Sequence, residues 1–126
     1  ITINYSSPSV KGRTIWGELV PYGKVWRAGA NAATTFETSK DITVEGKTLP
    51  AGKYSLFALP GENEWKIMFN SQTGQWGTQY DASKDVLAVS VKPTAASAMS
   101  EQLVYDVTGN GVVLKWEKLQ VPVSIK

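Results

Sequence analysis

The stretch LQVPVSI (Leu119–Ile125) decides the fold class, because apolar and polar residues alternate along all of it. A period of two puts every second side chain on one face, which is typical of a half-buried β-strand. Pro122 has no N–H to donate to a sheet ladder. We therefore expect this strand at a sheet edge or beside a bulge.

The same periodicity, or a run that is apolar on both faces, recurs along the chain. Including the stretch above, it predicts about nine short strands. The others are Ile1–Tyr5, Ile42–Val44, Lys47–Leu49, Lys53–Leu59, Trp65–Phe69, Asp85–Lys92, Gln102–Val107 and Val112–Glu117.

Helix and turn signals refine this pattern. Glu45-Gly46 predicts a hairpin turn, and only Thr94–Ser100 (TAASAMS) could form a helix, of one or two turns. We expect helix in under about a fifth of the chain, below the usual third. The fold prediction is an all-β, single-domain antiparallel β-sandwich over residues 1–126, jelly-roll-like or immunoglobulin-like, whose strand order does not follow from one sequence.

Composition excludes several classes of function. The chain has 126 residues, of which 42% are hydrophobic and 19% charged, which argues for one folded domain and against disorder. Its net charge of +2 is too small for a nucleic-acid footprint. Without His or Cys it has no zinc–thiolate site and no Ser-His-Asp triad. We expect no metal, no cofactor and no nucleic-acid partner.

The ends and loops of the chain add two expectations. It begins at Ile1 without an initiator Met, as a processed or trimmed product would. Ser71–Ser83 is the longest segment without periodicity. Long loops in compact domains are often functional, so we mark this segment as a candidate.

The segment Asp106–Glu117 matches part of a calcium-loop template. Asp, Thr, Asn, Gly and Glu fall at template positions, but the flanks alternate as strands where the template needs helices. Thr108 also replaces a charged ligand. We therefore favour a β-hairpin in which Gly109-Asn110-Gly111 forms a tight turn.

The carboxylates and tryptophans permit other chemistry that no spacing selects. Four acids lie near loops or aromatic residues: Glu18, Glu37, Asp81 and Asp85. Two facing carboxylates would allow glycoside hydrolysis, but solvated surface acids are commoner. Trp65 and Trp116 lie in alternating runs, so we expect them in the core and not on a stacking platform.

The segment Val20–Thr34 is the best candidate for a binding site. It places small residues around Arg27, one of two arginines, between Trp26 and Asn31. Arg and Asn offer convergent donors and acceptors, and we expect Trp76 and Tyr80 from the long loop to add flat apolar walls. An anionic or polyhydroxylated ligand suits this set. The alternative is that Arg27 pairs with Glu18 or Glu37 and only fastens the loop.

An ordered set of motifs over nearly the whole chain resembles a bacterial family, the domain of unknown function number twenty-nine eleven. The motifs are Ser7–Arg13, Leu19–Asn31, Leu49–Phe57, Gly74–Gly77 and Leu114–Glu117. The resemblance implies a secreted or lipoprotein-like, extracytoplasmic protein that meets the membrane only through an upstream lipid anchor. It transfers no functional residue.

These observations predict a non-enzymatic, extracytoplasmic β-sandwich module that binds a small molecule, a glycan or a partner protein. One alternative is a carboxylate-dependent hydrolase of the glycoside class, which needs a cleft with two acids. Another is a structural interaction module that acts through an exposed sheet edge.

Overall fold

The computed structural model describes residues 1–73 and 82–126 of the chain. Within these ranges the regular elements are strands and one 3-10 turn, η1 (Ala82–Lys84), so the prediction of an antiparallel all-β fold with little helix is confirmed. The finer expectation of a jelly-roll-like or immunoglobulin-like connection stays a prediction. The strands are β1 (Thr2–Ser6), β2 (Ala30–Thr38), β3 (Ile42–Val44), β4 (Lys47–Leu49), β5 (Gly52–Leu59), β6 (Trp65–Asn70), β7 (Asp85–Val91), β8 (Thr94–Thr108) and β9 (Gly111–Ser124).

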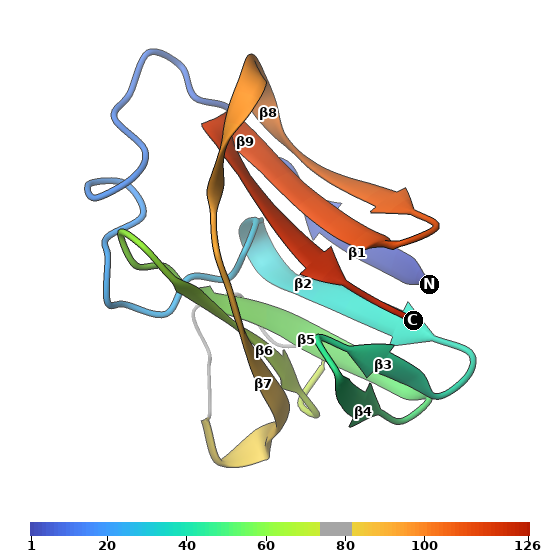
Figure 1. Cartoon of the computed structure of the whole chain (residues 1–126). Helices are drawn as coiled ribbons and strands as arrows, with labels where there is room; N and C mark the ends of the chain where they lie inside the picture. Colours follow the sequence, from blue (N-terminus) through green and yellow to red (C-terminus); the bar gives the residue numbers. More distant parts are fainter. Residues whose placement is uncertain (74–81) are drawn as a thin grey trace.

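One layer of the molecule is a five-stranded antiparallel sheet with the order β1-β2-β5-β6-β7 (Figure 1). Its centre is β5, in which Tyr54 to Ala58 are buried without alternation. Burial on both faces is what the two-sided apolar run Lys53–Leu59 predicts. Leu56 pairs with Thr34 of β2 and with Phe69 of β6, which fixes the register across the sheet.

The second layer contains the β8–β9 pair and the β3–β4 hairpin, and Figure 1 shows it lying across the five-stranded sheet. The β3–β4 hairpin and the β8–β9 pair meet where Thr43 of β3 and Lys126, which follows β9, exchange backbone hydrogen bonds of 2.8 Å in both directions. The predicted hairpin turn is confirmed, since Glu45 and Gly46 have φ values of 48° and 83°. Positive φ at both positions is the geometry of a tight two-residue turn between strands.

Within β9 the chain reverses its direction (Figure 1). Fourteen residues in a straight strand would span about 46 Å at about 3.3 Å each. Instead, the Ile125 N–H donates to the Asn110 carbonyl at 3.0 Å, so the two ends lie together. Glu117 has a φ of 57° at the reversal. The predicted strands Val112–Glu117 and Leu119–Ile125 are thus the two arms of β9: a first arm (residues 111–117) and a second arm (residues 118–124).

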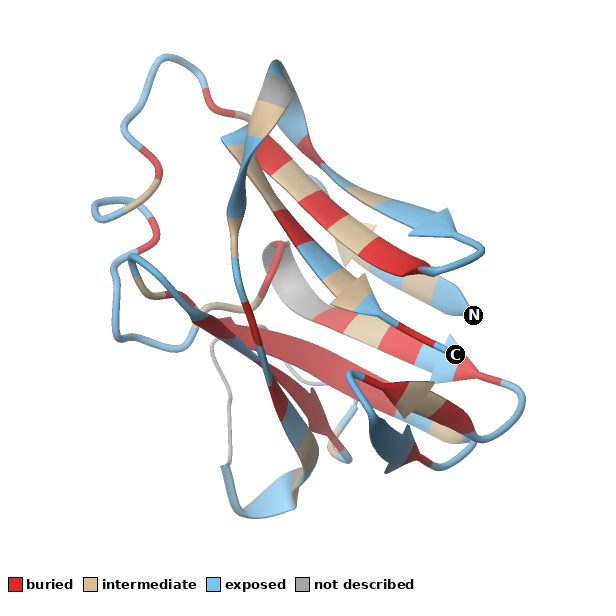
Figure 2. Ribbon diagram, in the orientation of Figure 1, coloured by how far each residue is buried: buried red, intermediate tan, exposed pale blue. Residues whose placement is uncertain are grey.

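A continuous apolar core lies between the two layers (Figure 2). Both layers contribute its largest members: Phe36, Leu56, Trp65 and Phe69 from the five-stranded sheet, and Leu103, Leu114, Trp116 and Val121 from β8 and β9. The prediction that Trp65 and Trp116 belong to the core is confirmed, because each is at most 1% exposed. Each such side chain contributes about 1.5–3 kcal/mol by leaving water.

One local prediction was wrong, and one strand was not predicted. The helix considered for Thr94–Ser100 is the first half of β8. Thr94 pairs with Gln120 and Ala95 with Leu119, and this pairing with β9 overrides a weak helical propensity. The sequence also does not predict β2, whose start is rich in small residues and lacks alternation. Tertiary pairing with both β1 and β5 makes it a strand.

Candidate functional site

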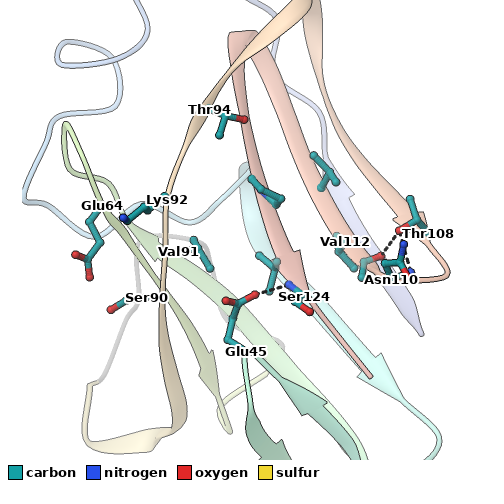
Figure 3. Close-up of a pocket in the computed structure, with 14 residues that line it drawn as sticks. Glu45, Glu64, Ser90, Val91, Lys92, Thr94, Thr108, Asn110, Val112 and Ser124 are labelled. Carbon is teal, nitrogen blue, oxygen red and sulfur yellow. Dashed lines mark hydrogen bonds between the residues drawn. The ribbon is translucent and has the colours of Figure 1, made fainter.

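An open groove of about 760 Å³ lies between the end of β7 and start of β8 on one side and β9 on the other (Figure 3). Four structural features meet there: the β3–β4 turn, the residue before β6, the β7–β8 connection and both arms of β9. Its lining residues are Glu45, Glu64, Ser90, Val91, Lys92, Thr94, Thr108, Asn110, Gly111, Val112, Val113, Pro122, Val123 and Ser124.

The floor of the groove is apolar. Val91 from β7 and Val112 from β9 are buried, while Val113 and Val123 are half-buried. Pro122 lies past Gln120, the last residue of β9 that pairs with β8, so its missing N–H removes no bond from that ladder. The floor therefore offers hydrophobic contact to a ligand.

Glu45 stands on the rim and is held by β9. Its backbone N–H donates to the Ser124 carbonyl at 2.9 Å, and its carboxylate accepts a hydrogen bond from the Ser124 N–H (Figure 3). The left-handed backbone of the Glu45-Gly46 turn directs this residue toward the second arm. Glu45 is thus a fixed negative charge at the groove.

Glu64 and Lys92 stand on the opposite rim. Trp65 pairs with Val91, which makes Glu64 and Lys92 neighbours just beyond the end of the β6–β7 ladder. Both are exposed. Among residues 1–73 and 82–126, the ion pair within 4.0 Å is Lys115–Asp106, so Glu64 and Lys92 keep their charges for solvent or a ligand.

This arrangement combines an apolar floor with hydroxyls and three charges on its rim. No aromatic residue belongs to the described lining, so the groove has no platform on which a sugar ring would stack. Within the described part of the chain, no three His, Cys, Asp or Glu side chains are close enough together to hold a metal ion. The chemistry that the groove offers is hydrophobic contact plus polar orientation.

The predicted site residue Trp26 lies in a cluster of four tryptophans. Its ring stacks with Trp116 at 5.9 Å between centroids and meets Trp16 and Trp65 edge-on at 5.8 and 6.1 Å. Trp26 is half-buried. Its main contacts are therefore those of a core residue.

Two members of this cluster leave a polar atom without a hydrogen bond. The indole N–H groups of Trp16 and Trp65 are buried and have no acceptor among the described residues. The rings of this pair meet edge-on at 5.2 Å. Such packing offers aromatic faces in place of oxygen acceptors.

Arg27 is half-buried and has no hydrogen bond or ion pair to any described residue. The alternative that it pairs with Glu18 or Glu37 is therefore wrong, because both acids are exposed and unpaired with it. Asn31 lies in β2. Trp76 and Tyr80 lie outside the described residues, as does most of the candidate segment Ser71–Ser83. A ligand site that combines these residues stays a prediction.

The family of the chain follows from one comparison. The family model described as "Protein of unknown function (DUF2911)" matches residues 1–125. The chain belongs to this family. No curated protein and no solved structure matches it. Within the described residues there is no helix of the length and apolar character needed to cross a membrane.

In this DUF2911 chain the end of the Leu19–Asn31 motif forms hydrogen bonds with both layers. Trp26 exchanges backbone hydrogen bonds of 2.7 and 2.9 Å with Ala58 of β5. The Ala28 carbonyl accepts two side-chain hydrogen bonds, from Thr34 at 3.1 Å and from the Tyr105 hydroxyl of β8. Ala28 has a φ of 54°, a strained value for a residue other than Gly, and these bonds hold it there.

Tyr105 links β8 to this motif from a half-buried position, with its hydroxyl directed to the Ala28 carbonyl. Burial raises the pKa of its hydroxyl far above the ordinary value, a nearby Tyr5 raises it further, and a hydrogen bond with Thr34 opposes both. The hydroxyl therefore stays protonated and remains a donor to Ala28.

The DUF2911 motif residue Gly29 has a steric role. A Cβ at this position would lie 2.6 Å from the Thr34 hydroxyl oxygen and 3.2 Å from the Ser6 carbonyl oxygen. Only Gly fits here without displacing β1 or β2.

The Asp106–Glu117 segment is a hairpin, as predicted. Thr108 of β8 pairs with Gly111 of β9, and Asp106 forms an ion pair with Lys115 at 3.3 Å. Of the three turn residues, Gly111 alone has a positive φ, of 150°. Asp106 is thus engaged by a cation of its own chain, and the absence of a metal requirement stays a prediction.

Sequence reasoning missed the groove. Its floor consists of valines that look like ordinary core residues, and its acids Glu45 and Glu64 lie nineteen positions apart in two different turns. The one usable signal was Pro122. Because it lacks an N–H, it indicates that the strand Leu119–Ile125 does not form a complete hydrogen-bond ladder.

Proposed function

We propose that the chain is a non-enzymatic binding module whose ligand is a small molecule with an apolar body, held in the groove. The observation that carries this proposal is a hollow of about 760 Å³ with a valine floor and a polar rim. Small-molecule sites have volumes of about 300–1,000 Å³ and this composition. The lack of an aromatic residue in the described lining disfavours a glycan, and the hollow shape disfavours a flat protein interface.

The rim supports one further feature of the ligand. Glu45 and Glu64 outnumber Lys92, so the groove has an excess of one negative charge. A cationic or hydrogen-bond-donating end would face these carboxylates favourably. Because all three side chains are exposed, this preference is modest.

The extracytoplasmic location, with an upstream lipid anchor, is part of the proposal. Its support is the family resemblance alone, from which we infer a secreted or lipoprotein-like bacterial protein. Fractionation of the cells that produce the protein tests it. Recovery in the cytoplasmic fraction would contradict it.

The binding proposal can be tested with N-phenyl-1-naphthylamine, an apolar fluorophore that brightens when it leaves water. We expect saturable binding with one site per chain. Thr94→Trp should weaken it strongly, because Thr94 is exposed and lines the groove (Figure 3). Thr48→Trp is the matched control, since Thr48 is an exposed threonine of β4 outside the groove. Equal loss of binding in both variants, or no saturable binding, would refute the proposal.

One observation favours a second candidate, the carboxylate-dependent hydrolase of the glycoside class. Glu45 and Glu64 line the same groove, as a pair of catalytic acids would. A panel of nitrophenyl glycosides tests this activity directly. The binding proposal predicts no release of nitrophenol, whereas release that Glu45→Gln or Glu64→Gln abolishes would favour the hydrolase.

A further inference from the structure

The segment between β1 and β2 (residues 7–29) holds the excess of positive charge in the chain. It contains four of the 13 Lys and Arg residues and one of the 11 Asp and Glu residues. Its net charge is therefore +3, whereas the rest of the chain has a net charge of −1. Arg13 and Lys24 are exposed, and neither side chain has a carboxylate within 4.0 Å among the described residues. Their charges are available to an anionic surface.

The same segment exposes apolar side chains. Among the described residues eight large hydrophobic side chains are exposed, and three of these lie within residues 19–25. They are Leu19, Tyr22 and Val25, at 46%, 41% and 42% exposure. Scattered hydrophobic residues are ordinary on a surface, but a group of them indicates an interaction site. The segment projects from one side of the two layers, and most of it is exposed (Figures 1 and 2).

The fold fixes the exposure of Leu19. Ile15 and Val20 belong to the same turn, and each is 2% exposed. The Val20 N–H donates to the Ile15 carbonyl at 2.9 Å, which closes the turn. The core therefore takes up two apolar residues of this turn and leaves Leu19 in solvent.

Tyr22 lies beside the turn that carries Leu19. A Cβ at Gly17, within that turn, would be 3.2 Å from the Tyr22 ring. The next residue, Gly23, donates its N–H to the Pro60 carbonyl at 2.8 Å, which holds the chain to the end of β5. Leu19 and Tyr22 are thus presented on backbone that is already hydrogen-bonded, so binding orders little of it.

We propose that residues 19–25 dock the domain on the surface of an anionic lipid bilayer. Aliphatic side chains enter the boundary between headgroups and acyl chains, Tyr favours the headgroup level, and Lys and Arg are attracted to anionic lipids. The segment supplies all three kinds of side chain. A protein partner fits less well, because three partly exposed side chains present far less than the about 800 Å² that each partner of a standard interface buries.

This docking surface is separate from the groove, because none of residues 19–25 lines it. The inference therefore goes beyond the proposed function, and either can fail without the other. It adds a direct membrane contact to the upstream lipid anchor that the family resemblance implies.

Flotation of the 126-residue chain with lipid vesicles tests the proposal. Vesicles of equal parts phosphatidylglycerol and phosphatidylcholine should bind the chain, and added salt should weaken this binding. Vesicles of phosphatidylcholine alone should bind it far more weakly. Equal binding to both kinds of vesicle, or no binding to either, would overturn the proposal.

Matched variants locate the contact. Leu19→Ser should weaken binding to the anionic vesicles about tenfold, and Lys24→Gln about fivefold. Val86→Ser and Lys118→Gln are the controls, because Val86 and Lys118 are exposed residues outside the segment. Both controls should bind like the unchanged chain. Losses of the same size in the controls would refute the assignment to residues 19–25.

A measurement on the unchanged chain is independent of how the variants fold. Spin-labelled lipid in the anionic vesicles should broaden the NMR signals of Leu19, Tyr22 and Val25 and spare those of Val86 and Val104, which are exposed elsewhere. Equal broadening at Val86 and Val104 would contradict the docking. Dimers that form without lipid and that Leu19→Ser abolishes would also overturn it, because they would assign residues 19–25 to a second copy of the chain.

Discussion

Replacing Gly111 with Ala should disrupt the reversal of β9. A Cβ at this position would lie 2.0 Å from the Val123 carbonyl oxygen and 3.0 Å from the Ile125 nitrogen, and both of these are backbone atoms. Backbone of the second arm cannot rotate away as a side chain can. Gly111 also has a φ of 150°, where Ala is strained.

The size of the effect follows from the displacement. Ordinary contact begins at 3.4 Å, so the two arms must separate by 1.4 Å from the present 2.0 Å. That movement breaks the 3.0 Å hydrogen bond from Ile125 to Asn110, a loss of about 1 kcal/mol. Strain at φ adds roughly 1–3 kcal/mol. With looser packing of the arms we expect a total loss of about 3–5 kcal/mol, near the upper end for a point mutation.

Chemical unfolding followed by tryptophan fluorescence measures this loss. Gly109→Ala is the control in the same turn, because a Cβ at Gly109 meets nothing within 4 Å and Gly109 has no positive φ. Its unfolding free energy should change by less than about 0.5 kcal/mol. If Gly111→Ala were as stable as Gly109→Ala, the two arms of β9 would not approach each other as described.

Three further predictions concern single side chains. Tyr105 stays protonated in the folded state because burial raises the pKa of its hydroxyl. In the unfolded chain the same group ionises near pH 10. Its contribution to the free energy of unfolding is therefore complete below that pH and is lost as the pH rises above it. Tyr105→Phe should therefore lower the unfolding free energy by about 1 kcal/mol at neutral pH. It should also make the decrease of unfolding free energy with alkaline pH shallower. An unchanged slope of unfolding free energy against pH would contradict this. Glu45→Ala removes the acceptor of the Ser124 N–H and should lower the unfolding free energy by about 0.5–1.5 kcal/mol, whereas Glu62→Ala, an exposed acid with no such bond, should not. Arg27→Ala should leave the melting temperature nearly unchanged, while a loss of about 3–5 kcal/mol would indicate a buried ion pair.

Local patterns were sufficient to predict most strands and poor at predicting how they are joined. Period-two runs located Trp65–Asn70 and both arms of β9, and the Glu45-Gly46 turn was predicted from its residue types alone. The reversal at Glu117 carries no turn signal, because a Glu with a φ of 57° is held by the packing of the two arms. The strand at Ala30–Thr38 was missed for the same reason, since its pairing partners decide its conformation.

The candidate site was harder to predict than the fold. Arg27 stands out in the sequence by its residue type and its small neighbours, and a ligand site there stays a prediction. The role that the structure gives those neighbours is structural. Gly29 makes room for Thr34, and Ala28 supplies the carbonyl that joins β2 and β8. The groove depends on which valines lie at the opening between layers, and a single sequence does not distinguish these from valines inside the core.

The valine methyl groups provide the most direct test of whether the groove binds an apolar small molecule. Their NMR signals can be followed while N-phenyl-1-naphthylamine is added. We expect saturable shifts at Val91, Val112 and Val123, which line the groove, and no shift at the exposed Val86 and Val104 outside it. Shifts of equal size at Val86 and Val104, or none at the groove valines, would contradict binding in the groove.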